Sequence, residues 1–460
     1  MKLPMTRREL MQLMAAAGLG SVLAGRAVAA EESDLPPPDA PAGKFREKQL
    51  IPTPATPRYP AALSGGKVVQ PERPLSVIHE TDVLVIGGGP AGFAAAVSAA
   101  RTGVKVAIVE RYGCFGGQWT GGMVLPILST HAKPGGKMTK VLRGIGDEIL
   151  QRLAKVEGGV VGYGEDKPNP SSDPEATMYM IDEMVVEAGV KVYFHCWVAD
   201  VIMEGPVVRG VVIESKAGRQ ALVGKVVIDA TGDGDVFAAA GADFEMRLHA
   251  VGLVHRLGNI DRIDKAKMKD AAKPVVGGKT PIPSVNWVNM RGPVVNCLDV
   301  AELSRLQLEE RRAIWTRTQK LRAREGAEQV YLLNTASQIG VRCSRLLVGM
   351  QQLTYKDSLD GKKFADVVGV GGMTDAVPAG WPIPYGTMVP KKLDGLLAAG
   401  RCISVDEKLI EGMRLIAPCL VTGHAAGAAA AVAVQTKCQP RNVEIAKVQK
   451  LLTEQGAYLG

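Results

Sequence analysis

The sequence lacks the cysteine patterns that mark a metal site or a small disulfide-rich protein. Its seven cysteines include no CxxC pair, and no Cys/His cluster has the spacing of metal ligands, so we expect no metal. The cysteines are too dispersed for a dense disulfide framework. An odd number leaves at least one thiol free unless it pairs between chains. We therefore expect mostly buried, reduced cysteines.

A large excess of charge is also missing. The chain has 55 Lys and Arg residues against 47 Asp and Glu residues, a formal net charge of +8. No dense Lys/Arg run is interleaved with aromatic residues, so nucleic acid is not an expected partner. There is no internal repeat, and the apolar "GAAAAVAV" near the C-terminus is too short to cross a bilayer.

The N-terminal segment is typical of a processing signal. Arg7 and Arg8 precede an apolar stretch from Leu10 to Leu23, and "AVAA" offers a small-residue cleavage site. The paired arginines resemble those of a twin-arginine export signal. An ordinary secretory signal and a basic helix start are the alternatives. The resemblance implies a periplasmic or otherwise exported protein that folds around a cofactor before export, with no membrane span once the signal is removed.

A glycine-rich turn between a buried strand and a helix predicts a dinucleotide site. In "DVLVIGGGPAGFAAAVSAARTGVKVAIVE", Gly87 allows a tight turn, Gly89 lets the backbone approach a pyrophosphate, and Gly92 permits close packing of helix on sheet. The helix that starts at Pro90 and Ala91 points its positive end at the phosphates. Glu110, followed by Arg111, ends the next strand at the distance expected for an acid that binds ribose.

The glycine signature does not distinguish FAD from NAD, but three later segments resemble FAD enzymes of the glutathione-reductase-like class. "RYGCFGGQWTGG" resembles their second phosphate-and-flavin loop, "VVIDATGDGD" a later strand whose ATG turn packs near adenosine, and "LLAAGRCISVDE" with "TGHAAGAAAAVAV" their C-terminal flavin motif. The resemblance implies noncovalent FAD. The cofactor-binding residues that it implies are Gly116, Gly117, Thr120, Val198, Ala230, Thr231, Gly232, Gly400, Arg401, Gly423, His424 and Ala425.

Further segments narrow this resemblance to the FAD-dependent oxidoreductase family, near the fumarate reductase and succinate dehydrogenase flavoproteins. They are "IGVRCSRLLVGMQQLT", "IPYGTMVPKKLDGLLAAGRCISVD" and "VIDATGDGDVFAAAGADFE", and the likeness covers nearly all of the chain after about residue 80. One departure is His424, where the family pattern has glutamine. The implied fold is α/β, a Rossmann-like FAD-binding domain of glutathione-reductase type interrupted by an inserted α+β substrate domain.

The composition shifts along the chain place the expected domain boundaries. They are a signal over 1–30, a proline-rich tether over 31–79, the FAD-binding domain over 80–240 and 386–438, the inserted substrate domain over 241–385, and a C-terminal helix or tail over 439–460. A long amphipathic helix is expected from Val300 to Arg324 within the insertion.

Five residues are candidates for chemistry. Arg342, Arg345 and Arg414 lie in apolar surroundings where an unpaired guanidinium is costly, so each is interpreted as a clamp for a substrate carboxylate or as a structural or FAD contact. His424 is expected at the start of the flavin-facing helix, where it could contact the cofactor, transfer a proton, carry a covalent flavin or cap the helix. Tyr385 could place a phenol near the substrate or pack as a buried tyrosine.

Three functions fit these motifs. The first is hydride transfer between flavin and a small organic substrate, possibly a carboxylate. A flavin oxidase or monooxygenase that uses oxygen directly is the second, and a non-catalytic electron-relay flavoprotein in a complex is the third. No second GxGxxG has a strand before it, so the sequence does not support NAD(P)H as a second substrate. A quinone, a cytochrome or oxygen is the expected electron acceptor.

Overall fold

The computed structural model describes residues 60–268 and 275–460. The predicted signal and most of the predicted tether fall outside these residues. The chain divides into two units, Met1–Pro74 and Leu75–Gly460. In the first unit, β1 (Ala62–Ser64) and β2 (Lys67–Val69) pair as an exposed antiparallel hairpin. Its turn uses two glycines with positive φ, as a two-residue hairpin turn requires.

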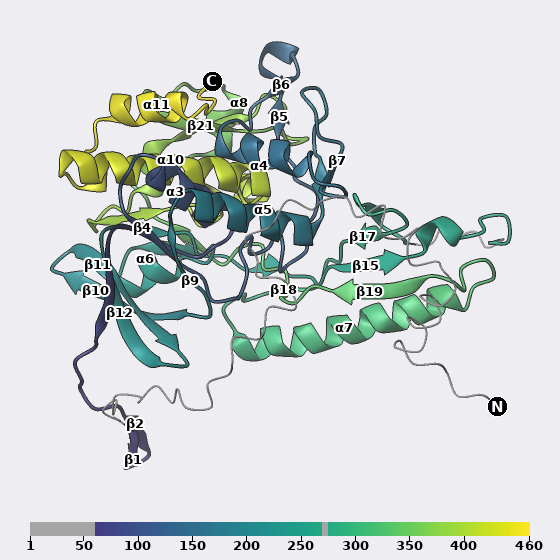
Figure 1. Ribbon diagram of the computed structural model, residues 1–460, viewed down its shortest axis with the longest axis horizontal. Helices are drawn as coiled ribbons and strands as arrows, with labels where there is room; N and C mark the ends of the chain where they lie inside the picture. Colours follow the sequence, from purple (N-terminus) through teal and green to yellow (C-terminus); the bar gives the residue numbers. More distant parts are fainter. Residues whose placement is uncertain (1–59, 269–274) are drawn as a thin grey trace, which may run out of the picture. The chain divides into compact units, whose positions relative to one another are not determined.

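The second unit is built around a seven-stranded sheet (Figure 1), so the predicted mixed α/β class is confirmed. Its order is β10-β11-β12-β3-β4-β9. Strand β23 pairs with the last residues of β12, Val227–Asp229, on the edge of β12 that faces away from β3. Strands β23, β12, β3, β4 and β9 run parallel, while β10, β11 and β12 form an antiparallel meander. The strands are β3 (Val77–Ile86), β4 (Val106–Val109), β9 (Lys191–Tyr193), β10 (Trp197–Glu204), β11 (Val207–Ser215), β12 (Gly218–Asp229) and β23 (Leu396–Ala398).

Two apolar helices, α3 (Pro90–Ala100) and α10 (Ile416–Thr436), pack side by side. A Cβ built on Gly423 would lie 2.0 Å from the carbonyl oxygen of Ala91, and one on Gly427 would lie 2.2 Å from that of Ala95. Only glycine permits this approach. Among the described residues, α10 alone has the length and apolar composition of a membrane span, but 94% of its apolar window is buried in the protein.

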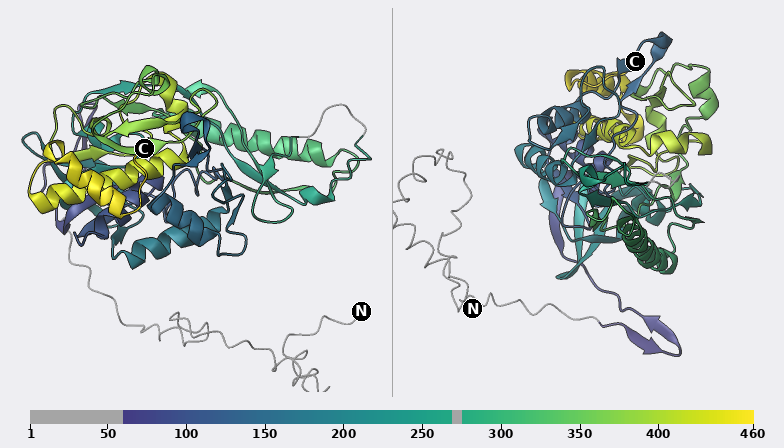
Figure 2. Two further views of the ribbon diagram at one scale, coloured as in Figure 1. Left: turned by 90° about the horizontal axis from the view of Figure 1, so that it is seen from above. Right: turned by 90° about the vertical axis from the view of Figure 1, so that its right-hand side faces the viewer.

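The other helices of the main body are α4, α5, α6, α8, α9 and α11, and with α3, α10 and the sheet they enclose one large hydrophobic core. Figure 2 shows α10 and α11 close together from a second direction. Helix α5 begins with Asp173, whose carboxylate accepts hydrogen bonds from two backbone N–H groups. The bounds are α4 (Ile145–Leu153), α5 (Pro174–Glu187), α6 (Asp235–Ala239), α8 (Tyr355–Leu359), α9 (Ile410–Met413) and α11 (Ile445–Glu454).

A lobe projects from this body and contains the four-stranded sheet β16-β17-β15-β19 and the long helix α7 (Val300–Arg322), as Figures 1 and 2 show. The predicted helix over 300–324 is therefore confirmed. The lobe has small apolar cores of its own, one of them formed by Leu257, Val288, Leu321, Ala327 and Val330. Its strands are β15 (His255–Gly258), β16 (Gly278–Lys279), β17 (Asn286–Val288) and β19 (Tyr331–Thr335).

The predicted insertion over 241–385 is too wide. Cys343, Leu346, Val368 and Trp381 belong to the core of the main body. The chain has therefore returned to that body by Cys343. The returning strands are three to five residues long, and so short a run has no periodicity that distinguishes one core from another. The short strands are β5 (His131–Ala132), β6 (Thr139–Lys140), β7 (Val160–Val161), β8 (Ser171–Ser172), β13 (Phe244–Met246), β14 (His249–Ala250), β18 (Val294–Val295), β20 (Arg345–Leu347), β21 (Val367–Gly371) and β22 (Trp381–Pro384).

Candidate functional site

A cavity opens at the carboxyl ends of β3, β4 and β12, the edge at which parallel sheets bind ligands. We call it the strand-end cavity. Thirteen of the predicted cofactor-binding residues line it, which brings together segments that are far apart in the sequence. They are Gly87, Gly89, Pro90, Ala91, Glu110, Arg111, Gly117, Val198, Ala230, Thr231, Gly232, Gly400 and Arg401.

The glycine-rich turn has the geometry predicted from its sequence. Gly87 has φ +96°, and a Cβ on Gly92 would lie 1.7 Å from the carbonyl oxygen of Gly87, so Gly92 serves helix packing and does not line the cavity. A Cβ on Gly89 would meet no protein atom within 4 Å. The open space beside Gly89 is the cavity itself, so the backbone there is free to approach a ligand.

Glu110 is buried, and its carboxylate is already held by the backbone. Oε2 accepts a hydrogen bond from the N–H of Gly88 at 2.6 Å, and Oε1 accepts one from the N–H of Tyr112 at 2.9 Å. An ionised carboxylate has about four acceptor positions, so two remain for ligand hydroxyl groups. The guanidinium of Arg111 lies 5.1 Å from the ring centre of Trp197, which also lines the cavity.

The loop "CFGGQWTGG" contributes Gly117 directly and uses its other predicted residues for shape. The hydroxyl of Thr120 donates to the carbonyl oxygen of Phe115 at 2.5 Å. A Cβ on Gly116 would lie 2.4 Å from that threonine side chain. Gly116 and Thr120 therefore fix the loop and do not line the cavity.

The turn of Ala230, Thr231 and Gly232 is fixed by the fully buried Asp229. One oxygen of Asp229 accepts hydrogen bonds from the N–H and the hydroxyl of Thr231, and the other accepts from the N–H groups of Val236 and Phe237. Burial raises the pKa of Asp229 to about 6. This carboxylate therefore holds both the turn and the start of α6 in place.

The helix expected to face the flavin begins at Ile416, seven residues before the predicted start at Gly423. Ile416 and Cys419, in its first turn, line the strand-end cavity. Gly423 and Ala425 lie two turns farther on and pack in the core. The two glycines of "GHAAG", Gly423 and Gly427, belong to the contact with α3 and do not mark the start of the helix. The positive end of α10 still points at the cavity.

His424 does not line the strand-end cavity. It is buried in the main body, and its Nε2 makes a 2.7 Å hydrogen bond with Oε1 of Gln455. Burial lowers the pKa of His424 to about 4. Cofactor contact, proton transfer and covalent flavin attachment through His424 are therefore contradicted by its position.

The buried His424 predicts a loss of stability in acid. Its folded pKa lies below the unfolded value of about 6.5, so the unfolded chain binds the extra proton as pH falls from 6.5 towards 4. The free energy of unfolding, measured with urea, should decrease between pH 7 and pH 4.5. This decrease should be about 2 kcal/mol smaller in His424→Gln than in the native protein. An equal decrease in both proteins would contradict the buried, neutral state of this ring.

Tyr385 and Arg345 also have structural partners. The hydroxyl of the buried Tyr385 donates to the carbonyl oxygen of Pro440 at 2.7 Å, away from the cavities. Arg345 donates to the carbonyl oxygen of Asp233 at 3.0 Å and to the carboxylate of Asp235 at 2.9 Å. Tyr385 is therefore a packed tyrosine, and Arg345 forms a structural ion pair.

A second cavity of about 510 Å³ adjoins the first, and we call it the arginine cavity. Both cavities are lined by Gln118, Arg401, Arg414 and Ile416. Arg342 and Arg291 line the arginine cavity as well, and Glu411 is the one carboxylate that does so in the described part of the chain. Apolar walls come from Val124, Pro126, Leu128, Val254, Trp287, Val341 and Leu415.

The arginines of this cavity differ in their partners. Arg414 pairs closely with Glu411, and the partly buried Arg401 pairs with Asp233 at 3.0 Å. Arg342 donates only to backbone carbonyls, that of Ala250 at 3.0 Å and that of Met290 at 3.4 Å. Among residues 60–268 and 275–460, no carboxylate is bonded to the guanidinium of Arg342.

The charge around Arg342 is unbalanced. Burial, and after it the positive charges of Arg414 and Arg291, lower the pKa of Arg342. Desolvated like charges are stabilised by a bound anion. The sequence identified Arg342 and Arg414 as clamp candidates, and the structure brings both to one cavity. Of the two, Arg342 is the one left to bind an anion.

Sequence reasoning missed three residues of this site. Gln118 could have been predicted, because it lies between the predicted residues Gly117 and Thr120. Glu411 lies three residues before Arg414 on a short helix, where an i, i+3 pair could have been expected. Arg291 follows a short strand in the projecting lobe, and nothing in the sequence signals its contact with the cavity.

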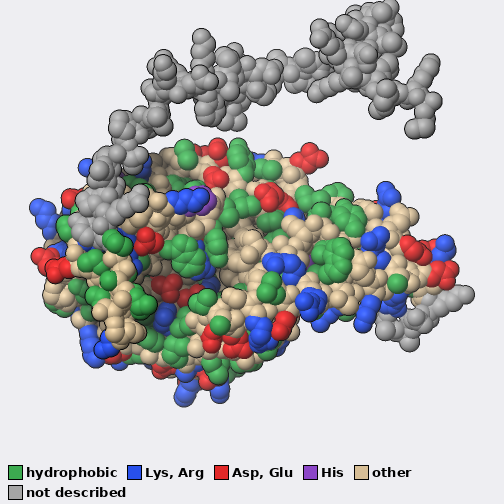
Figure 3. All heavy atoms as spheres, turned by 90° about the horizontal axis from the view of Figure 1, so that it is seen from below, with side chains coloured by type: hydrophobic (Ala, Val, Ile, Leu, Met, Phe, Trp, Pro, Cys, Tyr) green, Lys and Arg blue, Asp and Glu red, His purple; other side chains and the backbone are tan. Residues whose placement is uncertain are grey.

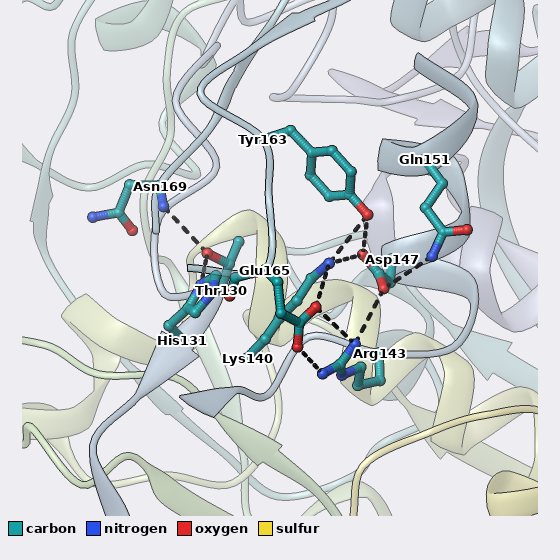
Figure 4. A network of polar contacts seen from close by, with 9 residues as sticks. All are labelled: Thr130, His131, Lys140, Arg143, Asp147, Gln151, Tyr163, Glu165 and Asn169. Carbon is teal, nitrogen blue, oxygen red and sulfur yellow. Dashed lines mark hydrogen bonds and ion pairs between the residues drawn. The ribbon is translucent and has the colours of Figure 1, made fainter. Parts of the chain in front are cut away.

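A further polar cluster is not a site. Lys140 and Asp147, both nearly buried, form an ion pair, and the hydroxyl of Tyr163 donates to Asp147 at 2.7 Å (Figure 4). Arg143 and Glu165 close the network at the surface. Burial raises the pKa of Tyr163, and Asp147 raises it further. These groups satisfy one another and line neither cavity, so the cluster links β6 to α4.

Residues 82–274 and 256–452 match the family model described as FAD dependent oxidoreductase. The chain belongs to this family. FAD is therefore its cofactor, and the chain is an enzyme of the oxidoreductase class.

Similarity to individual proteins is partial. Thiamine thiazole synthase of Methanococcus aeolicus is 35% identical over 163 residues, 33% of this chain and 55% of that protein. The synthase of Sulfolobus acidocaldarius is 34% identical over 172 residues, 35% of this chain and 59% of that one. The chain thus spans about half the length of the curated relatives it matches.

Solved structures with a similar chain course include a geranylgeranyl bacteriochlorophyll reductase-like protein of Thermoplasma acidophilum (15% identity, TM-score 0.45, 82% of this chain and 84% of that one). Another is p-nitrophenol 4-monooxygenase of Pseudomonas putida (13% identity, TM-score 0.43, 82% and 84%). At these scores the likeness carries no argument about reaction or substrate.

The strand-end cavity fits FAD. The unfilled space beside Gly89 and the N-terminus of α3 suit the pyrophosphate. The two open acceptor positions of Glu110 suit ribose hydroxyls. The N-terminus of α10 presents a positive dipole to the same cavity, which favours a group that becomes more negative on reduction.

Proposed function

We propose that this FAD-dependent oxidoreductase transfers a hydride between FAD and a small organic anion bound in the arginine cavity. The observation that carries the proposal is the shared wall of the two cavities, formed by Gln118, Arg401, Arg414 and Ile416. A ligand in the second cavity would therefore be a direct neighbour of one in the first. FAD supplies the reversible acceptor for two electrons, and the protein supplies position and charge.

Arg342 is proposed to hold the substrate by its anionic group. A guanidinium matches a carboxylate with two parallel hydrogen bonds, which fixes orientation as well as affinity. Apolar walls such as Trp287 and Val254 exclude water around the carbon skeleton. The cavity volume of about 510 Å³ is within the range for small-molecule sites.

Glu411 is proposed to exchange a proton with the substrate. Burial raises its pKa, but the hydrogen bonds and charge of Arg414 outweigh that effect and lower the pKa overall, so the carboxylate is ionised at neutral pH. Nε2 of His249 lies 3.1 Å from Oε1 of Glu411. During oxidation of an alcohol, Glu411 would accept the hydroxyl proton, and His249 could pass it towards solvent.

An anaerobic metabolite screen tests this function. The holoenzyme is mixed with organic acids, and loss of the visible absorption of oxidised flavin reports reduction. At least one small acid should reduce the flavin, and admission of air should re-oxidise it much more slowly than a quinone does. Fast re-oxidation in air would favour the oxidase or monooxygenase alternative. A flavin that no acid reduces would favour the electron-relay alternative.

Export by a twin-arginine route is also proposed, on the residues Arg7 and Arg8 alone. Changing both to lysine keeps the charge but should abolish accumulation outside the cytoplasm, because lysine lacks the planar guanidinium fork. Cell fractionation of the tagged full-length chain measures the effect. Normal export of the double variant would point to the general secretory route.

A further inference from the structure

A groove of about 400 Å³ lies in the projecting lobe between helix α7 and strands β15 and β17. We call it the α7 groove. Arg317 and Lys320 from α7 line it, and His255 from β15 lies against it. It is distinct from the arginine cavity, although Asn289 and Arg291 line both.

The groove carries positive charge without a lining acid. Its charged lining residues are Arg291, Arg317, Lys320 and Arg324, and no Asp or Glu of residues 60–268 and 275–460 lines it. The second half of α7, from Arg311 to Arg322, also contains no acidic residue. Figure 3 shows Lys and Arg side chains gathered along the middle of the projecting lobe.

Arg317 has no carboxylate partner among the described residues. Its guanidinium contacts the Sδ atom of Met290 at 2.7 Å, a weak acceptor. Arg305, earlier on the same helix, is bonded to both Glu302 and Glu309. Arg305 is thus neutralised by carboxylates of its own helix, whereas Arg317 is not.

His255 supplies the second, independent observation. It is 5% exposed, and its buried Nδ1 has no hydrogen-bond partner in the described part of the chain. Burial and the charge of Arg317 lower the pKa of His255 to about 4, so the ring is neutral at pH 7 and has one N–H to donate. An unsatisfied buried polar group is costly unless a ligand or ordered water completes it.

We propose that the α7 groove binds a small oxyanion, a phosphate or carboxylate group, through Arg317, Lys320 and His255. Two cations and one neutral donor are the groups that recognise such an anion. The site does not depend on the proposed reaction, because none of the three residues lines the arginine cavity.

Calorimetric titration of the holoenzyme with inorganic phosphate, and separately with citrate, tests the site at constant ionic strength. The native protein should bind at least one of the two, and the tighter probe shows whether phosphate or carboxylate is the preferred group. Arg317→Ala/Lys320→Ala should weaken that binding ten-fold or more. Arg311→Ala/Arg312→Ala removes the same charge from α7 outside the groove and should change it by less than two-fold.

Two further variants keep the test decisive. His255→Leu should weaken binding several-fold without lowering the melting temperature, because its buried Nδ1 has no hydrogen bond among the described residues to lose. Arg342→Ala should leave binding unchanged. The proposal would be overturned if the native protein bound neither probe, or if both double variants lost binding equally. It would also be overturned if Arg342→Ala lost binding while Arg317→Ala/Lys320→Ala retained it.

Discussion

Gly89→Val is expected to give a folded protein that does not retain FAD. A Cβ at this position meets no protein atom within 4 Å, and its backbone angle (φ −68°) is one that any residue adopts. The branched side chain would therefore fill the space beside the N-terminus of α3 without disturbing the fold. The flavin content per chain, measured by absorption after acid release of the cofactor, should fall from near one to near zero, while circular dichroism stays native.

Two glycine variants serve as controls for this result. Gly278→Val also has open space around its Cβ but lies in the projecting lobe, so it should retain FAD. Gly92→Ala places a methyl group 1.7 Å from a backbone oxygen, so it should fail to fold. A Gly89→Val protein that is loaded with FAD would contradict the assignment of the pyrophosphate site. Flavin that remains with the acid precipitate of the native protein would contradict noncovalent binding.

Arg342→Ala is expected to retain FAD and lose most of the substrate-driven reduction of the flavin. Hydrogen bonds to a charged group contribute roughly 1.5–3 kcal/mol, so at subsaturating substrate the rate should fall by about 10- to 100-fold. The loss should appear mainly in KM if Arg342 binds the ground state and the transition state equally. Stopped-flow reduction at several substrate concentrations measures both constants.

Arg345→Ala is the matched control, because it removes an arginine three positions away that is bonded to Asp233 and Asp235 and does not line the arginine cavity. Its reduction rate should stay within about two-fold of native for molecules that retain FAD. A reduction rate in Arg342→Ala that equals the native rate would place the anion-binding group elsewhere, with Arg291, Arg401 and Arg414 as the remaining arginines of the cavity.

The cofactor part of the site could be predicted because each of its motifs is local. A tight turn needs Gly87, close packing needs Gly92, and an acid at the end of the next strand gives Glu110. These requirements act over a few residues, so they remain visible in the sequence. The same holds for the strands β3 and β4, whose continuous apolar runs indicate burial on both faces.

The substrate part could not be predicted in the same way. Whether an arginine is free depends on a partner that only the fold supplies, and Arg414 acquires one in Glu411 while Arg342 does not. The expected place of His424, at the start of a flavin-facing helix, follows from the resemblance of "TGHAAGAAAAVAV" to the C-terminal flavin motif of other FAD enzymes. In the structure, Gly423 lies where α3 and α10 cross, and these helices are more than three hundred residues apart in the sequence.

The most direct test of the account compares one substrate with its uncharged counterpart. Anaerobic flavin reduction is measured with an acid found in the metabolite screen and with the amide of the same acid, in the native protein and in Arg342→Ala. If Arg342 binds the anionic group, the native protein should prefer the acid by about ten-fold or more, and the variant should lose that preference. Equal preference for the acid in both proteins would contradict the claim that the arginine cavity recognises its substrate through Arg342.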